Sequence, residues 1–134
     1  MQNSPSLKPI EVVAAIIQKD DKFLITKRLE KSHLGHCWEF PGGKIEPNET
    51  VEECIIRECK EEIDVEIKPI RKIKELTHSY DEVTVHLHFL LCELISGIPK
   101  PLECADLKWV NARELSDYEF PEADKNVLFY LSSR

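Results

Sequence analysis

Residues 43–65 read GKIEPNETVEECIIRECKEEIDV, and this stretch carries most of the information about the fold. Apolar side chains recur in it at steps of three and four residues, which is the period of an α-helix with one buried face. We therefore predict a helix over residues 49–63, packed against the rest of the protein through a stripe of four side chains, Val51, Cys54, Ile55 and Cys59.

The same helix is unusually acidic, with nine acids and two bases between residues 46 and 66. Glu58, Glu61 and Glu62 stand at i, i+3 and i+4, so they project from one helix face, where each like-charge pair costs about a few tenths of a kcal/mol. A bound divalent cation relieves such repulsion, and Mg²⁺ prefers carboxylate oxygens. A solvated acidic face is the alternative interpretation. We adopt that alternative only for Glu52 and Glu53.

Two neighbouring features fit a metal site. Arg57 lies four residues before Glu61 and eight after Glu49, so it can pair with either carboxylate. The Pro-Gly-Gly sequence at 41–43 breaks the preceding strand. Because glycine adopts backbone angles that other residues avoid, we expect the backbone carbonyls of this turn to approach the acidic face closely.

The rest of the chain alternates short apolar segments with turns, which predicts a mixed α+β domain with two principal helices. Residues 83–93 alternate apolar and polar side chains, as a strand with one buried face does. Strands are predicted at 10–17, 23–26, 38–40, 65–67, 70–77, 83–93 and 107–110. A short helical turn is expected at 111–115 and a closing helix at 122–131.

Composition limits the class of protein. A chain of 134 residues with 42% hydrophobic residues suits one globular domain, residues 1–134, with residues 1–9 as a flexible lead-in. We find neither a signal peptide nor a membrane-length apolar run and expect a cytoplasmic protein. The net charge of −7 argues against nucleic-acid polymers and anionic membranes as partners. The five cysteines lack metal-site spacing and read as reduced apolar residues.

The full spacing resembles the signature box of the Nudix hydrolases. Gly43 is followed after five residues by Glu49, and after seven more by Arg57-Glu58-Cys59-Lys60-Glu61-Glu62-Ile63-Asp64-Val65. The family has a glycine where this chain has Asp64. The requirement there is a backbone conformation that Asp tolerates better than most residues, so no ligand is lost.

This resemblance implies the Nudix fold, a mixed sheet sandwiched between helices in an α/β/α arrangement. It also implies Mg²⁺- or Mn²⁺-dependent hydrolysis of a nucleoside diphosphate linked to another group. The metal would be held by Glu58, Glu61 and Glu62 with the Gly43 carbonyl, and Glu58 is our choice of general base by similarity. Arg57 is counted with these catalytic residues.

The likeness is greatest to the MutT group, which hydrolyses nucleotides such as 8-oxo-dGTP to the monophosphate and pyrophosphate. It rests on the sequences EVVAAII (11–17), TKR (26–28), WEFPGGK (38–44) and FPEAD (120–124). Glu103 lies where MutT-like proteins place an additional metal-binding glutamate; a plain loop acid is the alternative. The implied substrate-binding residues are Arg28, His33, Phe40, Lys44 and Asp124; a solvated cation is the alternative for Lys44.

Asp124 is the expected reader of the base. When ionised it only accepts hydrogen bonds, which suits a base edge that offers N–H groups, in oxidised purine or cytosine nucleotides. Its alternative role is to cap the closing helix. His86 and His88 share a strand face, but the sequence places no further soft ligand beside them. We therefore treat them as ordinary sheet residues rather than as a zinc site.

Other functions remain open. ADP-sugars, dinucleoside polyphosphates or modified CTP and dCTP are alternative substrates for the same chemistry. A non-catalytic Nudix-fold nucleotide-binding domain is an alternative of another class, which the retained glutamates disfavour. The partner is a small-molecule nucleotide, and the protein is a monomer or homodimer.

Overall fold

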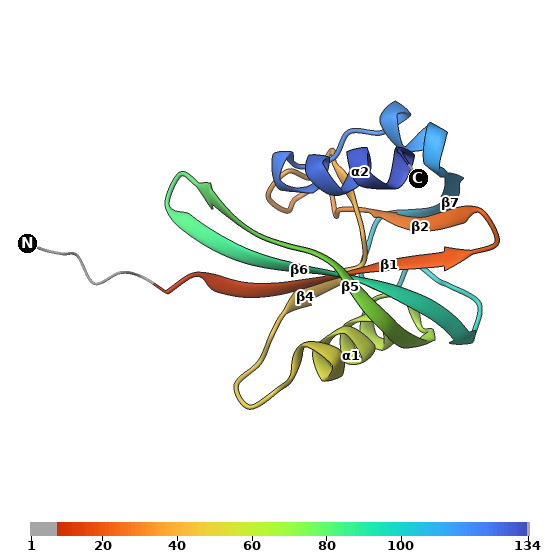
Figure 1. The fold of residues 1–134 in the computed structure, drawn as a ribbon, viewed down its shortest axis with the longest axis horizontal. Coiled ribbons are helices and arrows are strands. Elements are labelled where there is room, and N and C mark those ends of the chain that lie inside the picture. The colour runs from red at the N-terminus through yellow and green to blue at the C-terminus, as the bar shows by residue number, and fades with distance from the viewer. Residues whose placement is uncertain (1–7, 134) are drawn as a thin grey trace, which may run out of the picture.

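The computed structural model of the protein describes residues 8–133 (Figure 1). The first strands and the first helix are β1 (Ile10–Lys19), β2 (Lys22–Lys27), β3 (Trp38–Glu39), β4 (Gly42–Lys44) and α1 (Val51–Ile63). They are followed by β5 (Glu66–Tyr80), β6 (Val83–Ser96), β7 (Asp106–Asn111), two 3₁₀ helices (Ala112–Asp117 and Glu122–Asp124) and α2 (Lys125–Ser132).

The strands form one mixed sheet with β1 near its centre. The main order is β3-β2-β1-β6-β5, while β4 pairs with β1 and β7 with β2. β1 runs parallel to β6 along its length and antiparallel to β4 around Val13, which lies opposite Gly43. This pairing brings the Gly-Gly segment beside the central strand.

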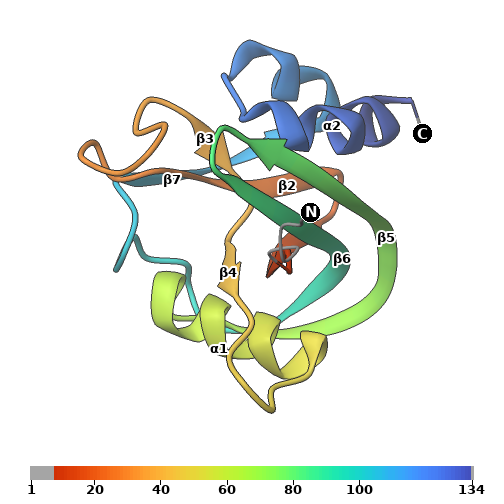
Figure 2. The same ribbon diagram turned by 90° about the vertical axis from the view of Figure 1, so that its left-hand side faces the viewer.

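Both faces of the sheet are covered, so the predicted α/β/α sandwich is confirmed. Alternate residues of β1 enter different cores, because successive side chains of a strand point to opposite faces. Val13, Ala15 and Ile17 pack on the α1 side. Ala14 and Ile16 pack on the side of α2 and the 3₁₀ helices. Figures 1 and 2 show α1 and α2 on opposite sides of the sheet.

The ends of α1 are specified locally. Thr50 is the N-cap and forms a capping box with Glu53, which satisfies backbone N–H groups that lack a partner in the first turn. At the other end Asp64 has φ 59° and ψ 42°, the left-handed conformation expected from its place in the box. Four buried residues, Cys54, Ile55, Cys59 and Ile63, anchor the helix, while Val51 is partly buried against the same core.

Three expectations about the strands were wrong. The two candidates at 65–67 and 70–77 form one strand, β5, which bends through register shifts. β6 buries both faces in its second half, where Leu90 and Cys92 join the α1-side core. The Gly-Gly segment is not only a breaker but forms β4, without left-handed backbone angles.

The closing helix also differs from its prediction. It begins as a 3₁₀ turn at Glu122–Asp124 and continues as α2 from Lys125. Residues 1–7 of the expected lead-in lie outside the described residues, and Lys8 and Pro9 precede β1 without regular structure. None of the helices within residues 8–133 combines the length and apolar character that crossing a membrane requires.

Candidate active site

Glu58 of α1 lies directly against Gly43 of β4. A Cβ atom placed on Gly43 would be 2.5 Å from Glu58 Cδ and 2.6 Å from both carboxylate oxygens. Burial raises the pKa of Glu58, and the charges of Glu61 and Glu103 act in the same direction, whereas Arg57 opposes them. Position 43 therefore requires glycine because the Glu58 carboxylate lies so close to its backbone, and not because of an unusual backbone angle.

Glu62, one turn further along α1, is buried with 7% of its surface exposed. Its carboxylate accepts a hydrogen bond from the backbone N–H of Gly42 at 3.1 Å. Burial raises the pKa of Glu62 to about 8, and the charges of Glu39, Glu58 and Glu103 contribute to the rise. Such perturbed carboxylates gather at functional sites.

Arg57 forms hydrogen bonds with three of the acids in this region. Its guanidinium donates to both oxygens of Glu49 at 2.6 and 3.0 Å, to Glu58 at 2.9 Å and to Glu61 at 3.1 Å. The sequence left Glu49 and Glu61 as alternative partners, and the structure has both. The hydrogen bond from Arg57 is the main reason that the pKa of Glu49 falls to about 2. Arg57 also donates to the Lys44 carbonyl at 3.2 Å, which ties α1 to β4.

Glu103 is brought to the same region by the loop before β7. Its backbone N–H donates to the Glu62 carbonyl at 3.2 Å, and its charge raises the pKa values of Glu58 and Glu62. The side chain is exposed. The structure thus places Gly43, Glu58, Glu61, Glu62 and Glu103 around one end of β4, although they span about half of the sequence.

The donors in this region fit a hard divalent cation. Carboxylate and carbonyl oxygens are what Mg²⁺ prefers, and the shared repulsion of Glu58 and Glu62 is what a cation relieves. Within residues 8–133, the groups whose ligand atoms all lie within 4.8 Å of one another do not include these carboxylates. Arg57 bridges two of them, because its Nη1 donates to both Glu58 and Glu61.

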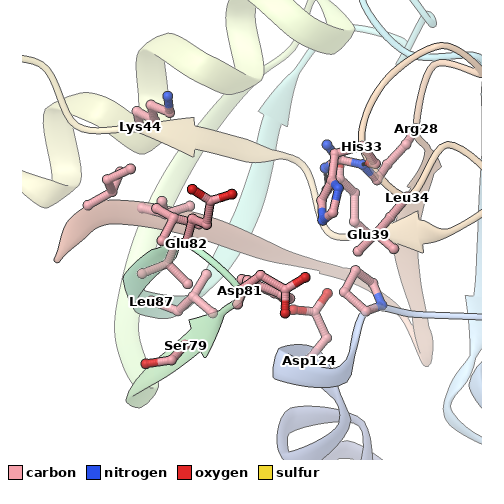
Figure 3. Close-up of a pocket in the computed structure, with 16 residues that line it drawn as sticks. Arg28, His33, Leu34, Glu39, Lys44, Ser79, Asp81, Glu82, Leu87 and Asp124 are labelled. Carbon is pink, nitrogen blue, oxygen red and sulfur yellow. Dashed lines mark hydrogen bonds and ion pairs between the residues drawn. The ribbon is translucent and has the colours of Figure 1, made fainter.

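A pocket of about 880 Å³ lies between the sheet and the segment before α2 (Figure 3). Four of the five predicted substrate-binding residues line it, namely Arg28, His33, Lys44 and Asp124. Figure 3 shows Lys44 on the β4 side of the pocket, with Arg28 and His33 on the opposite side. Phe40 is not among the lining residues, because its buried ring packs on Phe120 with ring centroids 5.5 Å apart.

Asp124 is the buried acid of this pocket, with 8% of its surface exposed. It occupies the N-cap position of α2 but makes no capping hydrogen bond through its side chain, so the structural alternative lacks support. Burial raises its pKa to about 7, the charge of Glu39 adds to the rise, and Arg28 opposes it. The ionised form considered from the sequence is therefore joined by a neutral form that can also donate a hydrogen bond. Near neutral pH the side chain is divided between its neutral and ionised forms.

Glu39 connects the pocket to the carboxylates of α1, and the sequence did not single it out. It accepts a hydrogen bond from Arg28 at 2.7 Å, while Arg28 Nε donates to the His33 carbonyl at 2.6 Å. Its charge raises the pKa values of both Glu62 and Asp124. A two-residue strand has too little periodicity to show which way Glu39 points, so no pattern could have identified it. Arg28 consequently holds the loop that carries His33, in addition to lining the pocket.

Comparisons with known proteins identify the family of this chain. The NUDIX domain family model matches residues 12–129. CTP pyrophosphohydrolase of Escherichia coli K12 is 33% identical over 122 residues, which are 91% of this chain and 90% of that protein. The 8-oxo-dGTP diphosphatase of the same organism is 29% identical over 123 residues, 91% and 95% of the two chains.

A solved structure shows the same likeness. The MutT protein of methicillin-resistant Staphylococcus aureus 252, a Nudix hydrolase, is 36% identical over 94% of this chain and 97% of its own, with a TM-score of 0.77. With the box residues gathered beside one pocket and the family match spanning nearly the whole sequence, this chain belongs to the Nudix family and is a MutT-like enzyme that hydrolyses phosphorus-containing anhydrides.

Proposed function

We propose that this protein is a Mg²⁺- or Mn²⁺-dependent nucleoside triphosphate pyrophosphohydrolase. It would convert oxidised or modified nucleotides, such as 8-oxo-dGTP, to the monophosphate and pyrophosphate. The observation that carries the proposal is the continuity of the carboxylate region and the pocket. Lys44 lines the pocket while the adjacent Gly43 touches Glu58, and Glu39 lines the pocket while its charge acts on Glu62.

Glu58, Glu61 and Glu62 would hold the metal, with the Gly43 carbonyl and Glu103 as further oxygen ligands. When bound, the metal supplies charge neutralisation to the phosphates and lowers the pKa of an attacking water. Glu58 would take the proton of that water, as the similarity to the Nudix signature box implies. Arg57 keeps Glu58 in place through its hydrogen bond.

The pocket residues would each contact a different part of the substrate. Lys44 of β4 lines the pocket and would contact the phosphate chain. Arg28 has hydrogen bonds to Glu39 and to the His33 carbonyl, so its main contribution is to position that loop around the nucleotide. Phe40, packed on Phe120, shapes the site from behind without lining the pocket.

Asp124 would select the base. In its neutral form it donates one hydrogen bond and accepts another, and in its ionised form it only accepts. A neutral acid matches a base edge with an N–H next to a carbonyl, which guanine and 8-oxoguanine present. A second candidate is a cytosine nucleotide, whose base offers an amine beside a ring acceptor. One relative, CTP pyrophosphohydrolase, carries such a nucleotide in its name.

A nucleotide panel with Mg²⁺, scored for pyrophosphate against phosphate, tests the proposal. Wild-type protein should release pyrophosphate from 8-oxo-dGTP or a modified dCTP in preference to the ordinary nucleotides. Glu58→Gln should lower kcat by roughly 10²- to 10⁴-fold. Glu52→Gln, on the same helix and exposed, is the matched control and should remain fully active.

Three results would contradict parts of this proposal. Retained turnover in Glu58→Gln would exclude Glu58 as the general base. Release of phosphate instead of pyrophosphate would exclude the proposed cleavage to the monophosphate and pyrophosphate. Tight nucleotide binding by the wild-type protein without turnover would favour the non-catalytic alternative.

A further inference from the structure

A second group of potential metal ligands is formed by residues that are not part of the proposed active site. It comprises Glu11 of β1, His86 and His88 of β6, and Glu75 of β5, from three neighbouring strands. Glu11 stands opposite His86 in the parallel pairing, and Glu75 stands opposite His88 in the antiparallel pairing. The sheet register therefore brings two imidazoles between two carboxylates.

The group lies on the reverse of the nucleotide pocket. Val12, Val85 and Leu87 alternate with these residues along the same strands and line the pocket. Glu11, His86 and His88 must point to the other face, where Val13 and Leu90 enter the α1-side core. The carboxylates around Gly43 do not belong to this group of ligand atoms.

The distances between these side chains are compatible with a cation-binding site. His88 Nε2 lies 2.8 Å from Glu11 Oε1, and His86 Nδ1 lies 3.1 Å from the same oxygen. One ligand atom from each of these three residues lies within 4.8 Å of the others. Two ring nitrogens therefore converge on one carboxylate oxygen.

A separate observation concerns His88, which is buried with 7% of its surface exposed. Its Nδ1 is a buried polar atom without a hydrogen-bond partner. The Oε1 atom of Glu75 lies 3.9 Å from it, beyond hydrogen-bonding distance. An unsatisfied buried polar atom is costly, and this nitrogen lies on the Glu75 side of the ring, whereas Nε2 is the ring nitrogen directed at Glu11.

Glu75 supplies the orientation that metal-binding histidines need. It lies 2.6 Å from His86 Nε2, so it can accept the proton of that nitrogen when Nδ1, 3.1 Å from Glu11, gives its lone pair to a metal ion. A ligating histidine commonly gives its other N–H to a carboxylate in this way. Lys72 pairs with Glu75 and fixes this carboxylate in turn.

We propose that His86 Nδ1, His88 Nε2 and the Glu11 carboxylate bind a transition-metal ion of the Zn²⁺ class, with Glu75 as the outer carboxylate. Two imidazoles favour such an ion over Mg²⁺ or Ca²⁺, which prefer sites made only of oxygen. The ion would link β1 to β6 behind the pocket, and through Glu75 would reinforce β5. It would therefore stabilise the wall on which the nucleotide rests.

The test is a Zn²⁺ titration of the full chain in excess Mg²⁺, which occupies the oxygen ligands around Gly43. Wild type should bind one Zn²⁺ per chain and unfold a few degrees higher in its presence. His86→Asn and Glu11→Gln should each weaken Zn²⁺ at least about tenfold. His78→Asn, a histidine of β5 outside the group, is the matched control and should bind as wild type does.

Spectroscopy locates the ion independently. Co²⁺ should give visible absorption typical of imidazole ligation, and NMR should show metal-induced shifts of His86 Nδ1 and His88 Nε2. Both signals should persist in Glu62→Gln and disappear in Glu11→Gln. Because His88 is buried and its replacement can unfold the protein, the more exposed His86 and Glu11 decide the outcome. Unchanged Zn²⁺ affinity in both variants, or loss of the site in Glu62→Gln, would overturn the proposal.

Discussion

The Glu58 carboxylate rests on the backbone of Gly43, so closely that a single added methyl group at Gly43 would overlap it at 2.5 Å. This contact joins the acidic helix to the strand that leads into the pocket. It explains in steric terms why the first position of the Nudix box is glycine.

Gly43→Ala should therefore displace Glu58 and lower kcat by roughly 10- to 100-fold, the range for losing support of a metal ligand. Mn²⁺ binding followed by electron paramagnetic resonance should weaken in parallel, while circular dichroism reports an intact fold. Wild-type activity in a folded Gly43→Ala protein would show that Glu58 need not occupy this place.

Glu62 should make the metal-free protein less stable as the pH rises from about 4.5 to about 8. Its folded pKa of about 8 exceeds the ordinary value of 4.5, so its stabilising contribution is complete below pH 4.5 and is lost as the pH rises towards 8. Urea unfolding in a chelator should show a loss on the order of a few kcal/mol across this window. Glu62→Gln should make the free energy of unfolding less dependent on pH. Mg²⁺ should restore the stability of the wild-type protein at high pH. A wild-type profile already flat in chelator would contradict the buried, protonated state.

Asp124 should make base selection depend on pH. Since its pKa is about 7, lower pH favours the form that both donates and accepts, and higher pH the form that only accepts. The ratio of kcat/KM for 8-oxo-dGTP to that for a cytosine nucleotide should change between about pH 6 and pH 8. Asp124→Asn, which cannot titrate, should hold one ratio throughout. If both proteins change alike, the base is read elsewhere.

Arg57→Lys tests whether geometry or charge matters at this position. Lysine keeps the charge but cannot donate to both oxygens of Glu49 while reaching Glu58 and Glu61. We expect kcat to fall roughly 10- to 100-fold. Lys60→Arg, an exposed exchange on the same helix, should leave kcat unchanged. Equal activity in the two variants would reduce the role of Arg57 to charge alone.

Asp64 should tolerate glycine and resist branched residues. Its φ of 59° lies in the left-handed region, where a side chain costs about 1–2 kcal/mol unless it is glycine or a short polar residue. Asp64→Gly should stay within about 1 kcal/mol of wild type, because the ion pairs with Lys60 and Lys100 at 3.7 and 3.8 Å are exposed and weak. Asp64→Val should lose about 1–2 kcal/mol in urea unfolding. Equal stability of the glycine and valine variants would contradict this account.

The sequence alone determined the features that depend on local spacing. The stripe around Cys54 and Ile55 predicted the helix because helical side chains recur every three to four residues. The same periodicity placed Glu58, Glu61 and Glu62 on neighbouring positions, and the conformation of Asp64 followed from its position after the last helical residue. These relationships involve residues within a few turns of one another, so no long-range information was needed.

Only the tertiary structure decided which distant residues meet. The pKa of Asp124, the position of Glu39 between the two halves of the site, and the meeting of Glu11 with His86 all depend on strand pairing and burial. Strand pairing is set by the packing of the whole sheet, since a shift of one residue would turn each side chain to the opposite face. Burial likewise depends on every layer above a residue, and therefore no local pattern of sequence reports it.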